Sequence, residues 1–208
     1  MIQIRRKEGE KLIEFGGGAN PKLSPQCQGG PDVCVDVRVC HNAEGKQTVD
    51  FTLDFNELFG DKISSNEFDA ALAVFVLEHI SWRKVPQFLS EVHRGLKGGG
   101  KVVFIGPNTE NQMKYILSKN EWDGDEGSMM FGDLDYPENS HKTAFSPRSI
   151  VKLLQEAGFE NIKVGPYGLE LGELKIQTDM VVEAFKPVQG TPQNALEMLG
   201  EGVGSIQS

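Results

Sequence analysis

The chain has 208 residues, which is enough for one domain with additions but not for two full domains. Its 30 acidic and 21 basic residues give a net charge of −9, which argues against nucleic acid as a partner because neutralising phosphates takes a basic surface. A hydrophobic content of 38% excludes disorder over the whole chain. The sequence has no apolar run long enough for a membrane span and no secretory signal, so we expect a cytoplasmic protein.

Short apolar segments separated by turn residues predict a set of β-strands. Valine at every second position of 32–39 has the period of a strand, and the apolar run within 68–77 is typical of a central parallel strand buried on both faces. The expected strands are 11–15, 32–39, 48–54, 68–77, 101–105, 161–164 and 180–185, of which the last two have the pattern of an antiparallel pair.

Two segments between these strands have the apolar spacing of amphipathic helices, at 82–96 and 146–157. The second is bounded by strong signals, with Ser146 as N-cap, Pro147 in the first turn and Gly158 just beyond the end. Strands that alternate with helices indicate an α/β domain with a mainly parallel sheet.

The composition divides the chain into a domain over 1–186 and a tail over 187–208. The tail is rich in Gly, Gln, Ser and Pro, and we expect it to be flexible, with a turn or two of helix at 194–199. Residues 108–141 are acidic and rich in turn residues, and a connection of that length within a domain is typical of a lid or a binding insertion.

Glycines and acidic residues follow the first three expected strands. Gly16, Gly17 and Gly18 come directly after the first strand, where glycine lets the backbone approach a ligand. Asp36 lies near the end of the second strand and Asp54 at the end of the third. Because open α/β sheets bind ligands at the carboxyl ends of their strands, we expect these residues to converge, with Asp36 accepting hydrogen bonds from ribose hydroxyls.

Several motifs together carry a family resemblance. They are Glu14-x-Gly16-x-Gly18, the acidic residues Asp36 and Asp54, F-D-A-A-L-A-V-F-V-L-E-H-I at 68–80, R-G-L-K-G-G-G-K-V-V-F at 94–104, and the segments 141–147 and 156–159. This set resembles the class I S-adenosylmethionine-dependent methyltransferases over most of the chain, and in particular a subgroup of small methyltransferases with an L-E-H motif. Asn20 stands where the family usually has a third glycine, and Gly98 where it usually has proline.

The resemblance implies a Rossmann-like fold, with a mainly parallel seven-stranded sheet and helices on both faces. It also implies S-adenosyl-L-methionine as the methyl donor. The acidic charge of the chain favours a small-molecule or sugar-linked acceptor over nucleic acid, and a homodimer is possible. The cofactor-binding residues that it implies are Glu14, Gly16, Gly17, Gly18, Asp36, Asp54, Ala73 and Phe75.

Methyl transfer to a hydroxyl or an amine requires the acceptor to lose a proton, and histidine is a suitable base near neutral pH. His79 follows the fourth strand directly, and His141 closes the 108–141 segment, so we expect these two to be the catalytic residues. His41 in a polar loop and His93 in the middle of a helix are expected to point elsewhere.

Other interpretations of the sequence have less support. Cys27, Cys34, Cys40 and His41 lack the short spacing of a structural zinc site, so no metal is expected. A nucleotide-dependent oxidoreductase or epimerase would use a Y-x-x-x-K pair, a spacing found at Tyr115–Lys119 in the 108–141 segment. A non-catalytic regulatory or scaffold subunit is the other alternative, because only a short stretch precedes the glycine motif and many methyltransferases cover the cofactor with additional helices there.

Overall fold

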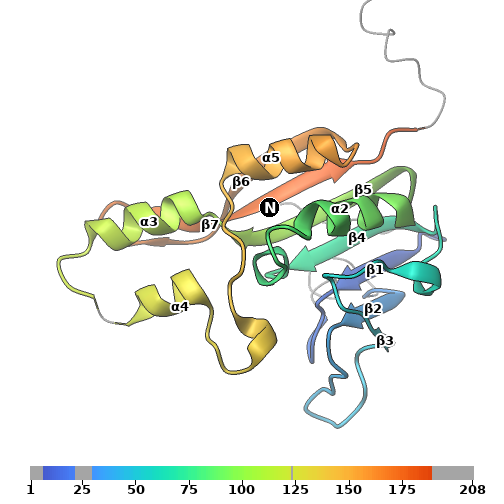
Figure 1. Ribbon diagram of the computed structural model, residues 1–208, viewed down its shortest axis with the longest axis horizontal. Coiled ribbons are helices and arrows are strands. Elements are labelled where there is room, and N and C mark those ends of the chain that lie inside the picture. Colours follow the sequence, from blue (N-terminus) through green and yellow to red (C-terminus); the bar gives the residue numbers. More distant parts are fainter. Residues whose placement is uncertain (1–6, 22–29, 123, 189–208) are drawn as a thin grey trace, which may run out of the picture.

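The computed structural model describes residues 7–21, 30–122 and 124–188 (Figure 1). Within them, seven strands form one sheet in the order β3-β2-β1-β4-β5-β7-β6. Strands β1 to β5 run parallel, and β7 lies antiparallel to both β5 and β6. The strands are β1 (Leu12–Phe15), β2 (Val33–Asp36), β3 (Phe51–Thr52), β4 (Phe68–Val74), β5 (Leu96–Pro107), β6 (Glu160–Leu171) and β7 (Ile176–Phe185).

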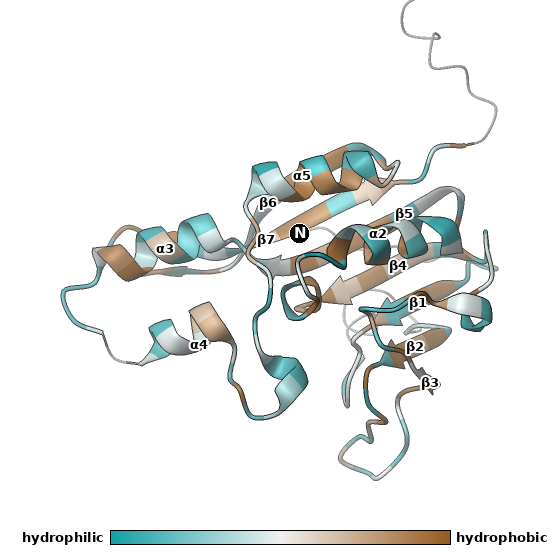
Figure 2. Ribbon diagram, in the orientation of Figure 1, coloured by the Kyte–Doolittle hydropathy of each residue, from teal (hydrophilic) through white to brown (hydrophobic). Residues whose placement is uncertain are grey.

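The predicted mainly parallel, seven-stranded Rossmann-like sheet is therefore confirmed in the described part of the chain. The centre of the sheet is buried on both faces. Ala71 and Ala73 of β4 belong to the main apolar core, whereas Leu72, between them, belongs to a second and smaller cluster on the opposite face. This alternation explains why the sequence of β4 is apolar at nearly every position (Figure 2).

Helices α2 (Val85–Gly95) and α5 (Pro147–Glu156) pack beside each other over the main core (Figures 1 and 2). The predicted caps of α5 are confirmed: the Ser146 hydroxyl accepts from the backbone N–H of Ser149 at 3.2 Å, and Gly158 has a φ of +91°. Helix α2 begins three residues later than the expected start at Trp82, since Pro86 is accommodated in its first turn.

The segment 108–141 is more regular than its composition indicated. It contains α3 (Thr109–Ser118), α4 (Asp125–Phe131) and the 3-10 turn η3 (Pro137–Asn139). Helix α3 packs against β7, and α4 lies next to α3 (Figure 1). The sequence did not predict α3 because the segment has little apolar periodicity. The helix is nevertheless capped, since the side chain of Asn108 accepts from the backbone N–H of Asn111.

Two further boundaries differ from the expectation. Strand β3 covers two residues of the expected 48–54, while β6 and β7 extend far beyond the predicted pair and form a long hairpin. Much of β6 is exposed, so it lacks the apolar pattern that reveals a buried strand. Of the expected tail, residues 189–208, with the helical turn expected there, lie outside the described residues.

A cluster of aromatic rings fixes the chain that follows β3 to the centre of the sheet. Phe15, at the end of β1, lies 5.4 Å from Phe88 of α2 and 6.0 Å from Phe55, measured between ring centroids. Phe59 packs on both Phe15 and Phe88. Edge-to-face pairs of this kind add to the free energy of apolar burial, so the residues just after β3 have a defined position at the sheet edge.

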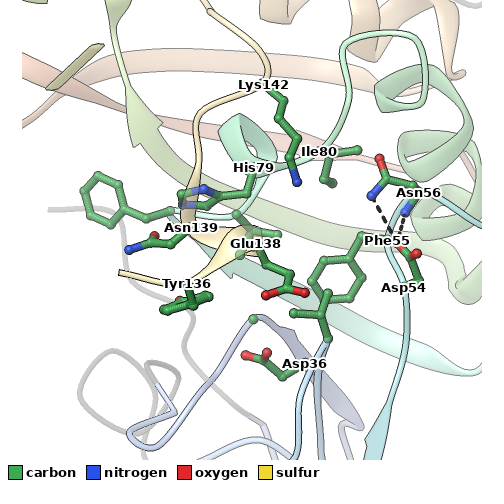
Figure 3. Close-up of a pocket in the computed structure, with 14 residues that line it drawn as sticks. Asp36, Asp54, Phe55, Asn56, His79, Ile80, Tyr136, Glu138, Asn139 and Lys142 are labelled. Carbon is green, nitrogen blue, oxygen red and sulfur yellow. Dashed lines mark hydrogen bonds between the residues drawn. The ribbon is translucent and has the colours of Figure 1, made fainter. Parts of the chain in front are cut away.

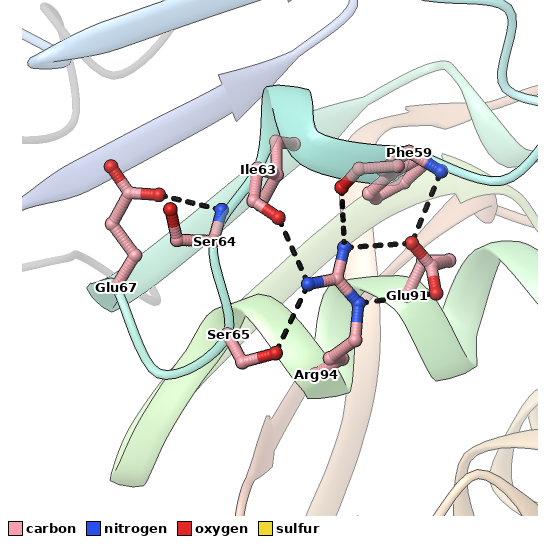
Figure 4. Close-up of polar contacts among 8 residues, drawn as sticks. Phe59, Ile63, Ser64, Ser65, Glu67, Glu91 and Arg94 are labelled. Carbon is pink, nitrogen blue, oxygen red and sulfur yellow. Dashed lines mark hydrogen bonds and ion pairs between the residues drawn. The ribbon is translucent and has the colours of Figure 1, made fainter.

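Arg94 holds the continuation of the same loop to α2 (Figure 4). Its guanidinium donates to the carbonyl of Ile63 at 2.9 Å and to the Ser65 hydroxyl at 3.1 Å, and it pairs with Glu91. The Glu91 carboxylate in turn accepts from the backbone N–H of Phe59 at 3.1 Å. Two side chains of α2 thus form hydrogen bonds with main-chain groups of the loop.

We expect Arg94→Met to lower the free energy of unfolding by about 1.5–3 kcal/mol, because it leaves the loop carbonyls and Glu91 without their charged donor. Urea denaturation followed by circular dichroism measures this change. Arg148→Met, on the exposed side of α5, is the matched control and is expected to stay within about 0.5 kcal/mol of wild type. Equal stability of both variants would show that Arg94 does not hold the loop.

Candidate active site

A cavity of about 430 Å³ opens at the carboxyl ends of β1, β2 and β4 (Figure 3). This volume lies within the range of roughly 300–1,000 Å³ that small-molecule sites occupy. Residues from widely separated parts of the chain line it: Gly16, Asp36, Val37, Asp54, Phe55, Asn56, Phe75, Val76, His79, Ile80, Tyr136, Glu138, Asn139 and Lys142.

The glycine turn after β1 is packed so closely that side chains are excluded. A Cβ atom on Gly16 would lie 2.3 Å from Cγ2 of Val76, and one on Gly17 would lie 2.4 Å from Sγ of Cys34. Gly16 also has a φ of +69°, which L side chains rarely adopt. The first strand therefore ends in bare backbone at the rim of the cavity.

Two carboxylates stand at the ends of the neighbouring strands. Asp36 accepts from the backbone N–H groups of Gly18 at 3.1 Å and Arg38 at 3.2 Å, so it also holds the glycine turn in place. Asp54 accepts from the backbone and side-chain N–H groups of Asn56. Because a carboxylate offers about four acceptor positions, both retain capacity for a ligand.

Strand β4 ends in a strained residue at the cavity wall. Phe75 has a φ of +53°, and its backbone N–H donates to the carbonyl of Ile105 at 2.7 Å. Phe75 is 42% exposed and lines the cavity. A bulky residue in the left-handed region costs free energy, and such strain is concentrated at functional sites.

His79 and His141 lie side by side, with ring centroids 5.1 Å apart. Nδ1 of His79 lies 3.2 Å from the carbonyl of Ser140, and Nδ1 of His141 lies 3.2 Å from the carbonyl of Met129. A carbonyl only accepts, so each Nδ1 carries the proton and each Nε2 keeps a lone pair. Burial is the main cause that lowers the pKa of both imidazoles, which favours the neutral form.

The closing segment, residues 132–146 between α4 and α5, forms the remaining side of the cavity. Tyr136 stacks under the guanidinium of Arg38, whose Cζ lies 3.5 Å from the ring centroid, and so connects this segment to the end of β2. Glu138, Asn139 and Lys142 also line the cavity (Figure 3). The 108–141 segment thus reaches the predicted site at its C-terminal end.

Glu78 is buried beside the histidines with 1% of its surface exposed. Within the described part of the chain, neither of its carboxylate oxygens has a hydrogen-bond partner. Desolvation by burial raises its pKa to about 8.

The structure brings part of the predicted site together. Gly16, Asp36, Asp54, Phe75 and His79 line the cavity. The other predicted residues, all of them described, are not part of its lining: they are Glu14, Gly17, Gly18, Ala73 and His141. Gly17, Gly18 and His141 are neighbours of lining groups, whereas Glu14 and Ala73 are completely buried within strands β1 and β4.

Four cavity residues were not predicted from the sequence: Glu138, Asn139 and Lys142 from the closing segment, and Asn56 after β3. No periodic pattern marks them, although Asn56 follows Asp54 closely enough to have been considered. The Tyr115–Lys119 pair of the oxidoreductase alternative lies in and just after α3, and neither residue lines the cavity.

Comparison with known proteins gives a family for this arrangement. The family model described as "Methyltransferase domain" matches residues 3–164, which is most of the chain. The chain belongs to this methyltransferase family. No curated protein matches it in sequence.

Solved structures share the methyltransferase fold at low sequence identity. A SAM-dependent methyltransferase from Archaeoglobus fulgidus is 16% identical with a TM-score of 0.61, over 86% of this chain and 87% of that one. A possible histamine N-methyltransferase from Thermotoga maritima is 19% identical with a TM-score of 0.59, over 86% and 84%. Phosphoethanolamine N-methyltransferase 2 from Haemonchus contortus, in complex with S-adenosyl-L-methionine, is 13% identical with a TM-score of 0.55, over 88% of this chain and 50% of that one.

Among the described residues, no helix has the length and apolar character needed to cross a membrane.

The packing of the glycine turn leads to a prediction about stability. We expect Gly17→Ala to lower the free energy of unfolding by about 1–3 kcal/mol, because the new methyl group overlaps Sγ of Cys34. Burial and nearby carboxylates raise the pKa of Cys34 to about 12, so its thiol is a neutral packing group. Adding Cys34→Ala should therefore restore part of the lost stability, as measured by urea denaturation.

The control is Gly127→Ala on α4, where a Cβ atom would meet no described atom within 4 Å. This variant is expected to be neutral or slightly stabilising. A Gly17→Ala variant as stable as Gly127→Ala would contradict the close packing of the turn.

Proposed function

We propose that this protein transfers a methyl group from S-adenosyl-L-methionine to a small-molecule or sugar-linked acceptor. The observation that carries the proposal is the cavity at the carboxyl ends of the central strands, with bare glycine backbone at Gly16 and the Asp36 carboxylate on its wall. Membership of the methyltransferase family and the cofactor of the structural neighbours support the same donor.

In this proposal the cofactor lies across the strand ends. Asp36 accepts from the two ribose hydroxyls, while Asp54 and its neighbours Phe55 and Asn56 surround the adenine. The methionine part lies along the glycine turn, close to the end of β4, where Phe75 faces the cavity. Glu14 is buried behind the turn, so it acts on the cofactor's ammonium group through the turn rather than by contact.

The acceptor side of the cavity is formed by His79, with His141 behind it. The lone pair on Nε2 of a neutral imidazole can take the proton that a hydroxyl or amine loses as it attacks the methyl group. The protein's role is then to align that nucleophile with the methyl group of the donor. The chain's charge of −9 favours a small acceptor over nucleic acid.

The closing segment has the position of a lid. Its contacts to the rest of the site include the stack of Tyr136 on Arg38 and the bond from His79 to Ser140. Both can break and re-form without disturbing the sheet, which would let the donor and acceptor enter.

The test of the donor site is calorimetric titration with S-adenosylhomocysteine. We expect Asp36→Asn to weaken binding at least about tenfold, because the ribose hydroxyls lose a charged acceptor. Asparagine is preferable to alanine here, since its amide oxygen can still accept from the N–H of Gly18. Glu44→Gln, in the exposed turn after β2, is the control and should bind as wild type does.

Unchanged affinity in Asp36→Asn would contradict the ribose assignment. Binding of NAD in place of S-adenosylhomocysteine by the wild-type protein would favour the oxidoreductase alternative and overturn the proposed function.

The test of the acceptor side uses labelled S-adenosylmethionine and a panel of hydroxyl- and amine-bearing small molecules. With an accepted substrate, we expect His79→Ala or His141→Ala to lower turnover by about 10²–10⁴-fold while donor affinity stays within a few-fold. Normal turnover in both variants would mean that alignment alone drives the reaction. Loss of donor binding in either would assign that histidine to the cofactor site.

A further inference from the structure

Glu78, His79 and His141 form a cluster of three potential metal ligands next to the cavity. One ligand atom from each lies within 4.8 Å of those of the other two. Ligand atoms on a tetrahedral zinc ion, each 2.0–2.1 Å from the metal, are about 3.4 Å apart. Small rotations of these side chains would therefore bring all three into coordination distance.

Glu78 is the unexplained member of the cluster. Its side chain is 1% exposed, and among the described residues neither carboxylate oxygen has a hydrogen-bond partner. Burying an unpaired carboxylate has a high free-energy cost, which a protein avoids by keeping the group protonated or offsets by placing a charged partner or a metal ion beside it. The described protein groups provide no such hydrogen bond here, whereas a cation between Glu78 and the histidines would compensate the charge.

Each of the two histidines makes the backbone hydrogen bond that metal-binding histidines usually make. Each donates its Nδ1–H to a backbone carbonyl, His79 to Ser140 and His141 to Met129, which leaves Nε2 free. A hydrogen bond of this kind fixes the tautomer and the ring orientation of a ligating histidine. The carbonyl of Glu78 also accepts from the N–H of Lys142 at 2.7 Å, so the backbone ties both sides of the cluster together.

The charges around the cluster are mixed but mainly acidic. The charge of Asp133 raises the pKa of both histidines, and the charge of Asp179 raises the pKa of Glu78. The positive charge of Lys142 lowers the pKa of His79. With Asp133 and Asp179 on one side and Lys142 on the other, the surroundings carry more negative than positive charge, which suits a divalent cation.

We propose that Glu78, His79 and His141 bind a divalent transition-metal ion of the Zn²⁺ type. Two imidazoles and one carboxylate are the ligands of known catalytic zinc sites, whereas Mg²⁺ and Ca²⁺ prefer oxygen ligands throughout. His79 is the member of the cluster that lines the cavity, so a cation bound to it would lie close to the bound acceptor. There the cation would attract an oxygen atom of the acceptor, which makes a hydroxyl-bearing compound the favoured acceptor class.

This proposal changes two earlier expectations. The spacing of the cysteines and His41 predicted no metal site, but the present cluster contains no cysteine. A bound cation would occupy the Nε2 lone pairs that otherwise take a proton, and it would instead lower the pKa of a hydroxyl bound to it, so that the hydroxyl proton could pass to water. The acceptor class rests on the proposed function, but the binding of the cation does not.

The test is calorimetric titration of the metal-free, tag-free full chain with ZnCl₂, together with a thermal melt with and without the metal. We expect binding at one ion per chain and a higher melting temperature with Zn²⁺. Glu78→Gln and His141→Ala should each weaken binding at least about 100-fold and abolish the thermal shift. Circular dichroism and the metal-free melt show whether each variant is folded, and Glu78→Gln keeps the size of the side chain.

His41→Ala is the matched control, since His41 is exposed and adjoins Cys40, a second place where zinc could bind. The proposal requires His41→Ala to bind Zn²⁺ as wild type does. Loss of binding in that variant, or an intense thiolate charge-transfer band with Co²⁺ in place of Zn²⁺, would place the metal at Cys40 and overturn the proposal. Wild-type chain that takes up no Zn²⁺ but binds S-adenosylhomocysteine would overturn the metal site alone and leave the proposed function standing.

Discussion

The site depends on one steric constraint, the absence of side chains in the turn after β1. At Gly16 and Gly17 the positions of a Cβ atom are already taken by Val76 and by Cys34. The turn can therefore lie directly against the ends of β2 and β4, and the backbone N–H of Gly18 reaches the Asp36 carboxylate. Because of this close approach, the ends of three strands meet around one cavity.

The fold was largely predictable because its central strands obey simple burial rules. β4 is buried on both faces and reads as an uninterrupted apolar run, and the caps of α5 are specified by Ser146, Pro147 and Gly158. Elements whose stability comes from contacts distant in sequence were not predictable in this way. Helix α3 is held by its packing on β7, for example by the bond from Asn111 to the carbonyl of Gln177, and no local pattern reveals that contact.

The same distinction separates the predicted from the missed site residues. Asp36, Asp54 and His79 follow strands, so parallel topology alone brings them to one edge of the sheet. Glu138 and Lys142 arrive there because the chain folds back after α4, a result of tertiary contacts such as Tyr136 on Arg38. The direction of the Glu14 side chain could have been predicted from the sequence. Its neighbours Ile13 and Phe15 face the main core, and because side chains alternate along a strand, Glu14 points to the other face of the sheet.

The turn after β4 combines features that each reduce stability. Phe75 has a left-handed backbone conformation, and Glu78 is buried without a hydrogen-bond partner among the described residues. Main-chain bonds compensate for them from both sides: the N–H of Phe75 donates to Ile105, and the carbonyl of Glu78 accepts from the segment that follows His141. A turn fixed in this way cannot relax by moving Glu78 out to solvent without losing those bonds. The unfavourable carboxylate is therefore kept beside the histidines, which is the arrangement that a cation-binding site requires before the cation arrives.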